Sequence, residues 1–300
     1  MPIPAQTFLM GSDRHGPEEA PVHRVIVDDF AIEQHQVTNA QYGRFVAETG
    51  YVTVAERPLD PADYPGAPAE NLQPGSMVFT RTPGPVDLRH INQWWRWTPG
   101  ASWRCPEGPG SSVNDRGEHP VTQVAHEDAA AYARWAGRTL PSEAQWEAAA
   151  RGGLENADYV WGPTAEQAGE RLANYWHGDF PWRSESGYGA TAAVGSFAPN
   201  AYGLSDMAGN VWEWTDDWYR DGFDADAADD CCLPQNPRGV TEADSYDPRQ
   251  PQFRIPRKVV KGGSFLCADS YCLRYRPAAR RPQMIDTGMS HIGFRCAVWI

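Results

Sequence analysis

Two cysteines in the segment from Lys261 to Arg276, KGGSFLCADSYCLRYR, have the clearest potential for chemistry. Cys267 and Cys272 are spaced as Cys-x-x-x-x-Cys, with glycine, aromatic and arginine residues around them. Thiolates are soft ligands, so a close pair suits Cu(I) or Zn(II) far better than Mg(II) or Ca(II), which prefer oxygen. On spacing alone two other interpretations stay open: a structural disulfide, and two unrelated buried thiols that behave as small hydrophobic side chains.

The composition limits the redox state of the thiols and the kind of partner. Six cysteines in 300 residues are too few for a disulfide framework. The opening MPIPAQTFLMGSDRHG lacks the charged start and apolar core of a secretory signal, and no apolar run is long enough to span a membrane. We therefore expect a cytoplasmic, monomeric protein with reduced thiols. Its formal net charge of -13 argues against nucleic-acid binding and suits a basic ligand.

Glycine and proline set the expected architecture. The chain has 28 Gly and 26 Pro, which interrupt it so often that long regular elements are not expected, and 13 Trp supply a large aromatic core. We predict an α+β fold, with residues 1–300 forming one compact, loop-rich domain that has little regular secondary structure.

Local patterns place the few regular elements. Residues 23–32 alternate apolar and polar side chains and predict a strand. Residues 39–48 predict a helix, because Thr38 and Gln41 form a capping box. The alanine-rich residues 128–135 predict another helix.

A third helix is expected to run to Ala150, with Ser142 and Gln145 as its capping box. Glu143 and Glu147 lie at i and i+4 on it. Because no histidines have matched spacing, we interpret both as ordinary polar-face positions.

The remaining stretches carry weaker signals. Residues 57–112 predict a long irregular region, and residues 259–260 and 294–299 predict strands. Cys231 and Cys232 are adjacent, a spacing that resists disulfide formation, and we assign them no chemistry.

One acidic motif is a candidate for a hard cation. Asp206-x-x-Gly209-x-Val211-x-Glu213 offers two carboxylates with small residues between them. Carbonyl oxygens of the intervening residues could complete the oxygen-rich shell that Ca(II) prefers.

Several short motifs follow one another along the chain: FLMGS (8–12), VTN (37–39), GYVT (50–53), WAGR (135–138), LPSE (140–143), RGG (151–153), GNVWEW (209–214), GGSFLCADSYCLRYRPAAR (262–280) and HIGFRC (291–296). These motifs and their order resemble the sulfatase-modifying factor family, also called formylglycine-generating enzymes. The resemblance covers nearly the whole chain, and the paired cysteines are the motif specific to the enzyme branch.

This resemblance implies a fold related to C-type lectins and a copper-dependent oxidase. The implied reaction uses O2 and a thiol reductant to convert a cysteine of an unfolded sulfatase polypeptide, in the motif Cys-x-Pro-x-Arg, to Cα-formylglycine. Cys267 and Cys272 would hold the copper, and the substrate thiol would complete the site. Ser264, Tyr271, Arg274 and Trp212 match family residues around the oxygen site.

The resemblance also implies structural calcium. It supports the set from Asp206 to Glu213 and adds a second set: the side chain of Asn174 with the carbonyls of Tyr175 and Tyr188. Ser186 stands where the family commonly has an Asp, so the second set lacks that carboxylate, and Glu185 is the candidate to replace it.

Two other functions remain as alternatives. A non-haem iron oxygenase resembling the sulfoxide synthases needs a facial His cluster, and the sequence contains no His-x-His motif. A noncatalytic binding module of the same fold would not need both cysteines. The retained pair therefore favours the oxidase.

Overall fold

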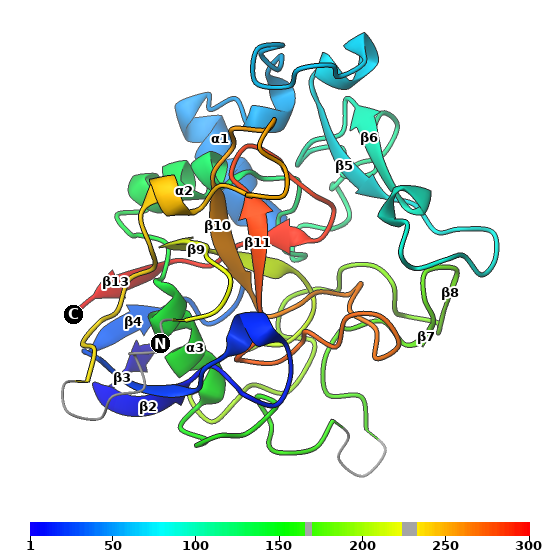
Figure 1. Ribbon diagram of the computed structural model, residues 1–300. Coiled ribbons are helices and arrows are strands. Elements are labelled where there is room, and N and C mark those ends of the chain that lie inside the picture. The colour runs from blue at the N-terminus through cyan, green and yellow to red at the C-terminus, as the bar shows by residue number, and fades with distance from the viewer. Residues whose placement is uncertain (166–169, 224–232) are drawn as a thin grey trace.

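The segment that carries the cysteines leaves from the central sheet of the molecule. The computed structural model describes residues 1–165, 170–223 and 233–300. The central sheet has the order β11-β10-β9-β12, with bounds Arg280–Met284, Arg257–Lys261, Trp212–Trp218 and Ile292–Gly293. Strand β10 is antiparallel to β9 and β11, whereas β12 is parallel to β9. Every residue of β10 is buried, so the segment starts from a firmly packed support (Figure 1).

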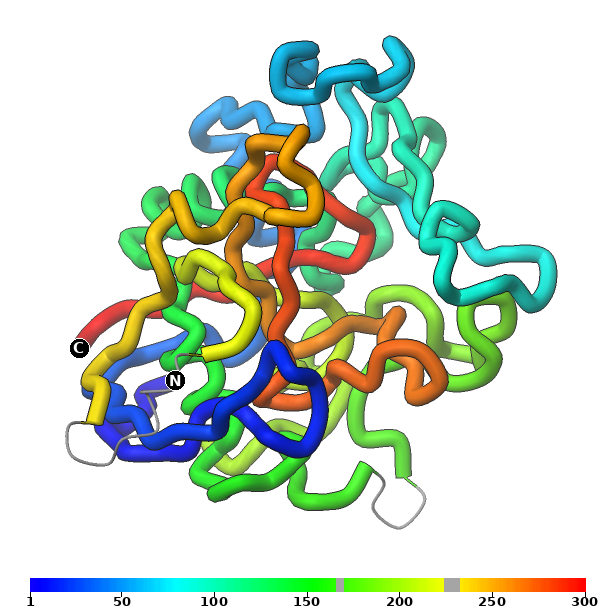
Figure 2. Tube along the Cα trace, viewed as in Figure 1, coloured from blue at the N-terminus to red at the C-terminus, as the bar shows by residue number. Residues whose placement is uncertain are grey.

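Short strands complete the β structure. A second sheet has the order β1-β4-β13, with bounds Pro2–Ile3, Phe30–Ile32 and Ala297–Trp299, and it joins the two ends of the chain. The termini accordingly lie near each other (Figure 2). Three two-stranded sheets pair β2 (Gln6–Met10) with β3 (His23–Val27), β5 (Gly75–Phe79) with β6 (Trp95–Pro99), and β7 (Gly178–Asp179) with β8 (Arg183–Ser184).

Three α-helices form where the capping boxes and the alanine-rich segment predict them. They are α1 (Asn39–Thr49), α2 (His126–Trp135) and α3 (Glu143–Arg151). The predicted capping boxes of α1 and α3 are both present. Each of these two helices ends at a glycine in the left-handed conformation, Gly50 or Gly152, which satisfies the helix end without a Cβ clash. No helix in the described ranges is long and apolar enough to cross a membrane.

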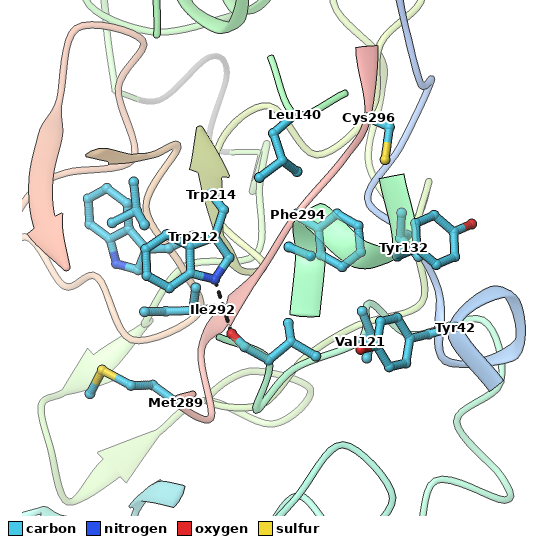
Figure 3. Packing of buried hydrophobic residues seen from close by; sticks show 14 of the residues in the cluster. Tyr42, Val121, Tyr132, Leu140, Trp212, Trp214, Met289, Ile292, Phe294 and Cys296 are labelled. Carbon is cyan, nitrogen blue, oxygen red and sulfur yellow. Dashed lines mark hydrogen bonds between the residues drawn. The ribbon is translucent and has the colours of Figure 1, made fainter. Parts of the chain in front are cut away.

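Aromatic side chains from distant elements form the main core. Tyr42 of α1 stacks on Tyr132 of α2 at 5.8 Å between ring centroids, and Tyr132 meets Phe294 edge-on at 5.3 Å (Figure 3). Trp214 of β9 belongs to the same cluster, and its indole N–H donates to the carbonyl of Val124. Both Trp212 and Cys267 also pack into this cluster, so the core directly supports the cysteine segment.

Two expectations about elements are wrong. Residues 23–32 form two strands, β3 and β4, in different sheets. The strand breaks at Asp28 and Asp29, because Asp28 hydrogen-bonds with Asn236 and the carboxylate of Asp29 accepts from the backbone N–H of Ala5. The region 57–112 is not wholly irregular, since it contains the hairpin β5–β6. Cys231 and Cys232 lie outside the described residues.

Candidate active site

The chain folds back tightly after β10 and brings the two cysteines together. Gly263 follows the strand with φ +73°, and a Cβ there would lie 2.8 Å from the carbonyl of Arg274. Only glycine fits this close approach without strain. Two turn-like hydrogen bonds then shape the segment, from Cys267 N to the carbonyl of Ser264 and from Cys272 N to the carbonyl of Ala268, each 2.9 Å.

The two sulfurs are free thiols in hydrogen-bond contact. Cys267 is buried and Cys272 is partly exposed. Burial raises the pKa of Cys267 well above its usual value, and the thiol stays protonated. The hydrogen bond from Cys267 lowers the pKa of Cys272 to about 7. The pair therefore combines a thiol donor with a neighbour that is readily a thiolate, the form that binds metals. The structure contains no disulfide between them.

All residues predicted for catalysis line one cavity of about 180 Å³, which we call the thiol cavity: Trp212, Ser264, Cys267, Tyr271, Cys272 and Arg274. The structure thus brings these six residues together around one space. The sequence analysis missed other residues of the wall: Met77, Ile91, Trp95, Phe180, Leu266, Arg281, Met289 and His291.

Each polar residue of the thiol cavity is held in place. Ser264 is fully buried, and its hydroxyl accepts a hydrogen bond from the backbone N–H of Leu266. The ring of Tyr271 stacks on Phe180 at 4.7 Å between centroids. Arg274 donates to Glu18 Oε1 at 2.9 Å, so its charge is paired within the protein. These contacts fix the polar groups before any ligand enters.

Arg281 and His291 form a pair that sequence reasoning did not find. Arg281 Nη1 lies 3.1 Å from His291 Nε2. Because a guanidinium only donates, Nε2 must accept and the imidazole is neutral with its proton on Nδ1. Burial and the Arg281 charge lower the pKa of His291 well below its usual value, which agrees with a neutral imidazole. Trp95 packs against the imidazole at 4.7 Å between ring centroids.

A larger groove opens beside the thiol cavity. It has a volume of about 760 Å³ and is lined mainly by apolar side chains and backbone, including Pro65, Pro68 and Phe253. It shares four wall residues with the thiol cavity: Met77, Ile91, Arg281 and Met289. We call it the long groove. The long groove and the thiol cavity are therefore adjacent.

A third cavity, of about 500 Å³, also meets the thiol cavity. Four arginines line it: Arg249, Arg274, Arg280 and Arg281. Glu18 and Asp221 lie in the same wall. We call it the arginine cavity.

The first calcium set does not fit a calcium ion. The amide nitrogen of Gln36 donates to the carbonyls of Asp206 and Val211 and to Glu213 Oε1, at 3.0 to 3.3 Å. Both oxygens of Glu213 also accept from Arg295, at 2.7 and 2.8 Å. Protein donors thus already occupy the carbonyls of Asp206 and Val211 and the carboxylate of Glu213, an arrangement that does not fit a calcium ion.

The second set fits better. Asn174 is buried, its amide nitrogen donates to Ala190 O and Asn210 Oδ1, and its Oδ1 has no hydrogen-bond partner. A buried oxygen without a donor is costly unless a ligand meets it. The carbonyl of Tyr188, however, already accepts from Arg81 and Ser184. Glu185 pairs with Arg171 instead of joining the set.

The interpretation of Glu143 and Glu147 as polar-face residues is wrong. Both are buried, at 3% and 0% exposure, and Lys261 Nζ lies 3.4 Å and 3.0 Å from their carboxylates. Arg280 binds Glu143 with two hydrogen bonds of 2.8 Å, and Arg151 binds Glu147. Burial alone would raise the pKa of Glu147, but Lys261 and Arg151 outweigh it and lower that pKa to about 2. This charge cluster anchors the residue from which the cysteine segment starts.

Comparisons with known proteins agree with the motifs. A sequence profile described as "Sulfatase-modifying factor enzyme 1-like domain" matches residues 1–300. A formylglycine-generating enzyme of Mycobacterium tuberculosis is 54% identical over 98% of this chain and 95% of its own length. One from Thermomonospora curvata is 44% identical over 98% of this chain and 91% of its own. The solved structure of PvdO from Pseudomonas aeruginosa, 23% identical, has a TM-score of 0.65 and covers 100% of this chain and 94% of its own, which shows a shared fold.

Proposed function

The chain belongs to the sulfatase-modifying factor family, and from this we propose that it oxidises a cysteine in a Cys-x-Pro-x-Arg motif of a sulfatase polypeptide to Cα-formylglycine, with copper and O2. The observation that carries the proposal is the pair of free thiols in the wall of a cavity that shares four wall residues with the largely apolar long groove.

The donor set suits a soft monovalent metal. Cys267 and Cys272 are in contact, and Cys272 readily gives up its proton, as a thiolate ligand must. In the described ranges no group of three or more His, Cys, Asp and Glu side chains is arranged to hold a metal. We therefore propose that the two thiols would hold Cu(I) and that the substrate thiol would be the further ligand. Bound copper would supply the one-electron chemistry with O2 that these side chains lack.

The residues of the chain bind and shield the substrate. The long groove would take the peptide in an extended form, with apolar walls against its proline, and the net charge of -13 favours its arginine. Phe180, Tyr271 and Trp212 would keep water away from the reacting carbon. Ser264 would present its hydroxyl to the oxygen.

The electron balance requires an outside reductant. The substrate Cβ loses two electrons as it becomes an aldehyde, and its sulfur leaves as hydrogen sulfide. O2 accepts four electrons in all, so a pair of external thiols supplies the remaining two and becomes a disulfide. One oxygen atom enters the aldehyde and the other leaves as water. A cytoplasmic monomer, bathed in reduced thiols, would meet this requirement.

We also propose a structural cation at Asn174. Its partnerless Oδ1 supports this, with the carbonyl of Tyr175 as a further ligand; the carbonyl of Tyr188 would join only by giving up its hydrogen bonds from Arg81 and Ser184. Copper would do the chemistry, and this cation would only support the fold.

Mass spectrometry of a Cys-x-Pro-x-Arg peptide tests the proposal. Protein loaded with Cu(I), in the presence of O2 and a thiol reductant, should exchange the sulfur and two hydrogens of the peptide cysteine for one oxygen. A peptide with serine in place of the cysteine is the control and should keep its mass. If the cysteine peptide binds but is never converted, the fold serves as a binding module and the oxidase proposal fails. If Fe(II) restores turnover and Cu(I) does not, the iron oxygenase alternative is supported.

A further inference from the structure

Arg281 occupies the point where the three cavities meet. It lines the thiol cavity, the long groove and the arginine cavity. A ligand in any of the three spaces would therefore come close to its guanidinium.

The charge of Arg281 differs from those of the other arginines of the arginine cavity, because each of the others has a carboxylate partner. Arg274 pairs with a glutamate at 2.9 Å, Arg280 with a glutamate at 2.8 Å and Arg249 with an aspartate at 3.2 Å. In the described part of the chain Arg281 forms no ion pair, and its hydrogen bond is to His291. An unpaired, partly buried cation is costly, and an anionic ligand would relieve that cost.

His291 holds the guanidinium without neutralising it. A neutral imidazole accepts one of the five N–H donors of the guanidinium and leaves the rest for a ligand. No nitrogen of Arg281 is among the fully buried side-chain atoms that lack a partner, so the unused donors are not sealed off. Trp95 packs on the imidazole and limits its movement. His291 thus holds the Arg281 guanidinium in place as a hydrogen-bond donor.

We propose that Arg281, positioned by His291, binds a carboxylate beside the thiol pair. This rests on the proposed function, which places a peptide and a small thiol there. The planar fork of a guanidinium matches a carboxylate with two parallel hydrogen bonds. Glu18 and Asp221 in the arginine cavity would repel a doubly charged phosphate more strongly than a singly charged carboxylate.

Two sources of such a carboxylate exist in the proposed reaction. One is an acidic side chain of the substrate polypeptide next to its cysteine. The other is the carboxylate of a small thiol reductant. Both use the same recognition, and matched probes separate them.

Binding to copper-free protein tests the proposal without turnover. One probe pair is mercaptopropionate and mercaptopropionamide, in which a neutral amide of similar size replaces the carboxylate. The other is a Cys-x-Pro-x-Arg peptide with Glu or Gln beside the cysteine. Apparent Kd values come from shifts in melting temperature across a concentration series. Wild-type protein should prefer the charged member of at least one pair by about tenfold or more, because charge-assisted hydrogen bonds are strong.

Variants locate the preference. Arg281→Gln should abolish it, whereas Arg249→Gln, which removes one positive charge from the same cavity, should keep it. His291→Phe should weaken the preference because it removes the acceptor, and His291→Gln should restore it by supplying an amide oxygen. That rescue separates positioning from mere structural support.

The outcomes are distinct from those of the turnover assay. A preference in the thiol pair alone assigns the carboxylate to the reductant, and one in the peptide pair alone assigns it to the substrate. Equal Kd values within both pairs in wild-type protein overturn the proposal. It is also overturned if Arg249→Gln loses the preference for the charged probe as completely as Arg281→Gln does. If the peptide is not converted, the oxidase proposal fails, but the measured preference for a carboxylate remains valid.

Discussion

The buried charge cluster at the root of the cysteine segment gives a quantitative prediction. Lys261 has no exposed surface and pairs with Glu147 at 3.0 Å and Glu143 at 3.4 Å. Replacing it by methionine keeps most of the length of the side chain but removes the charge. Loss of one partner from a buried ion pair costs about 3–5 kcal/mol.

The remaining partners place Lys261→Met at the low end of that range. Glu147 keeps Arg151 at 2.7 Å, and Glu143 keeps Arg280 at 2.8 Å. We expect a loss of about 3 kcal/mol in the free energy of unfolding. Glu147→Gln should cost more, about 5 kcal/mol, because Arg151 would lose its carboxylate and Lys261 would keep only the 3.4 Å contact.

Urea denaturation followed by tryptophan fluorescence measures both values. Arg44→Gln is the control, since its pair with Glu48 has side chains 72% and 46% exposed and should contribute almost nothing to the free energy of unfolding. A change below about 1 kcal/mol for Lys261→Met, or a smaller loss for Glu147→Gln than for Lys261→Met, would refute this account of the cluster.

Three further predictions concern the site. Gly263→Ala should lower the free energy of unfolding in urea melts by about 1–3 kcal/mol, because φ is +73° and the added Cβ would lie 2.8 Å from the carbonyl of Arg274. Gly50→Ala is the control; its φ is +70° but its Cβ would meet open space, so the loss should be smaller. In copper-free protein, the rate of alkylation of Cys272 should rise with pH, with a midpoint near pH 7. Cys267→Ala removes the hydrogen bond that lowers the pKa of Cys272. The midpoint should therefore move to higher pH, and the rate at pH 7 should fall by up to about 50-fold. An unmoved midpoint would contradict the proposed contact. Calcium chelation should lower the melting temperature of wild-type protein but not of Asn174→Ala, and equal responses would exclude a cation at this residue.

Local signals predicted the local structure well. The capping boxes before α1 and α3 depend on residues three positions apart, so the sequence was enough to place both helix starts. The break between β3 and β4 was missed because it depends on Asn236, which pairs with Asp28 from far along the chain. The alternation of apolar and polar residues in 23–32 does not indicate a partner so distant in the sequence.

The same contrast holds for the site. The cysteines and their flanking residues were found because one motif carries most of them, with Trp212 in a second motif. Arg281 and His291 were missed because neither stands in a metal-binding or catalytic spacing. Only the folded chain brings them to 3.1 Å, and no pattern in the sequence signals that contact. Glu143 and Glu147 were misjudged for a related reason, since their partner Lys261 lies more than a hundred residues away.

The affinity for Cu(I) tests the central claim most directly. Competition with a chromophoric chelator under reducing, oxygen-free conditions compares wild-type protein with Cys267→Ser, Cys272→Ser and Cys105→Ser, the last being a free thiol outside the thiol cavity. The account predicts tight binding by wild-type protein and Cys105→Ser, and its loss in the other two variants. Unchanged affinity in Cys272→Ser would show that the thiol pair is not the copper site.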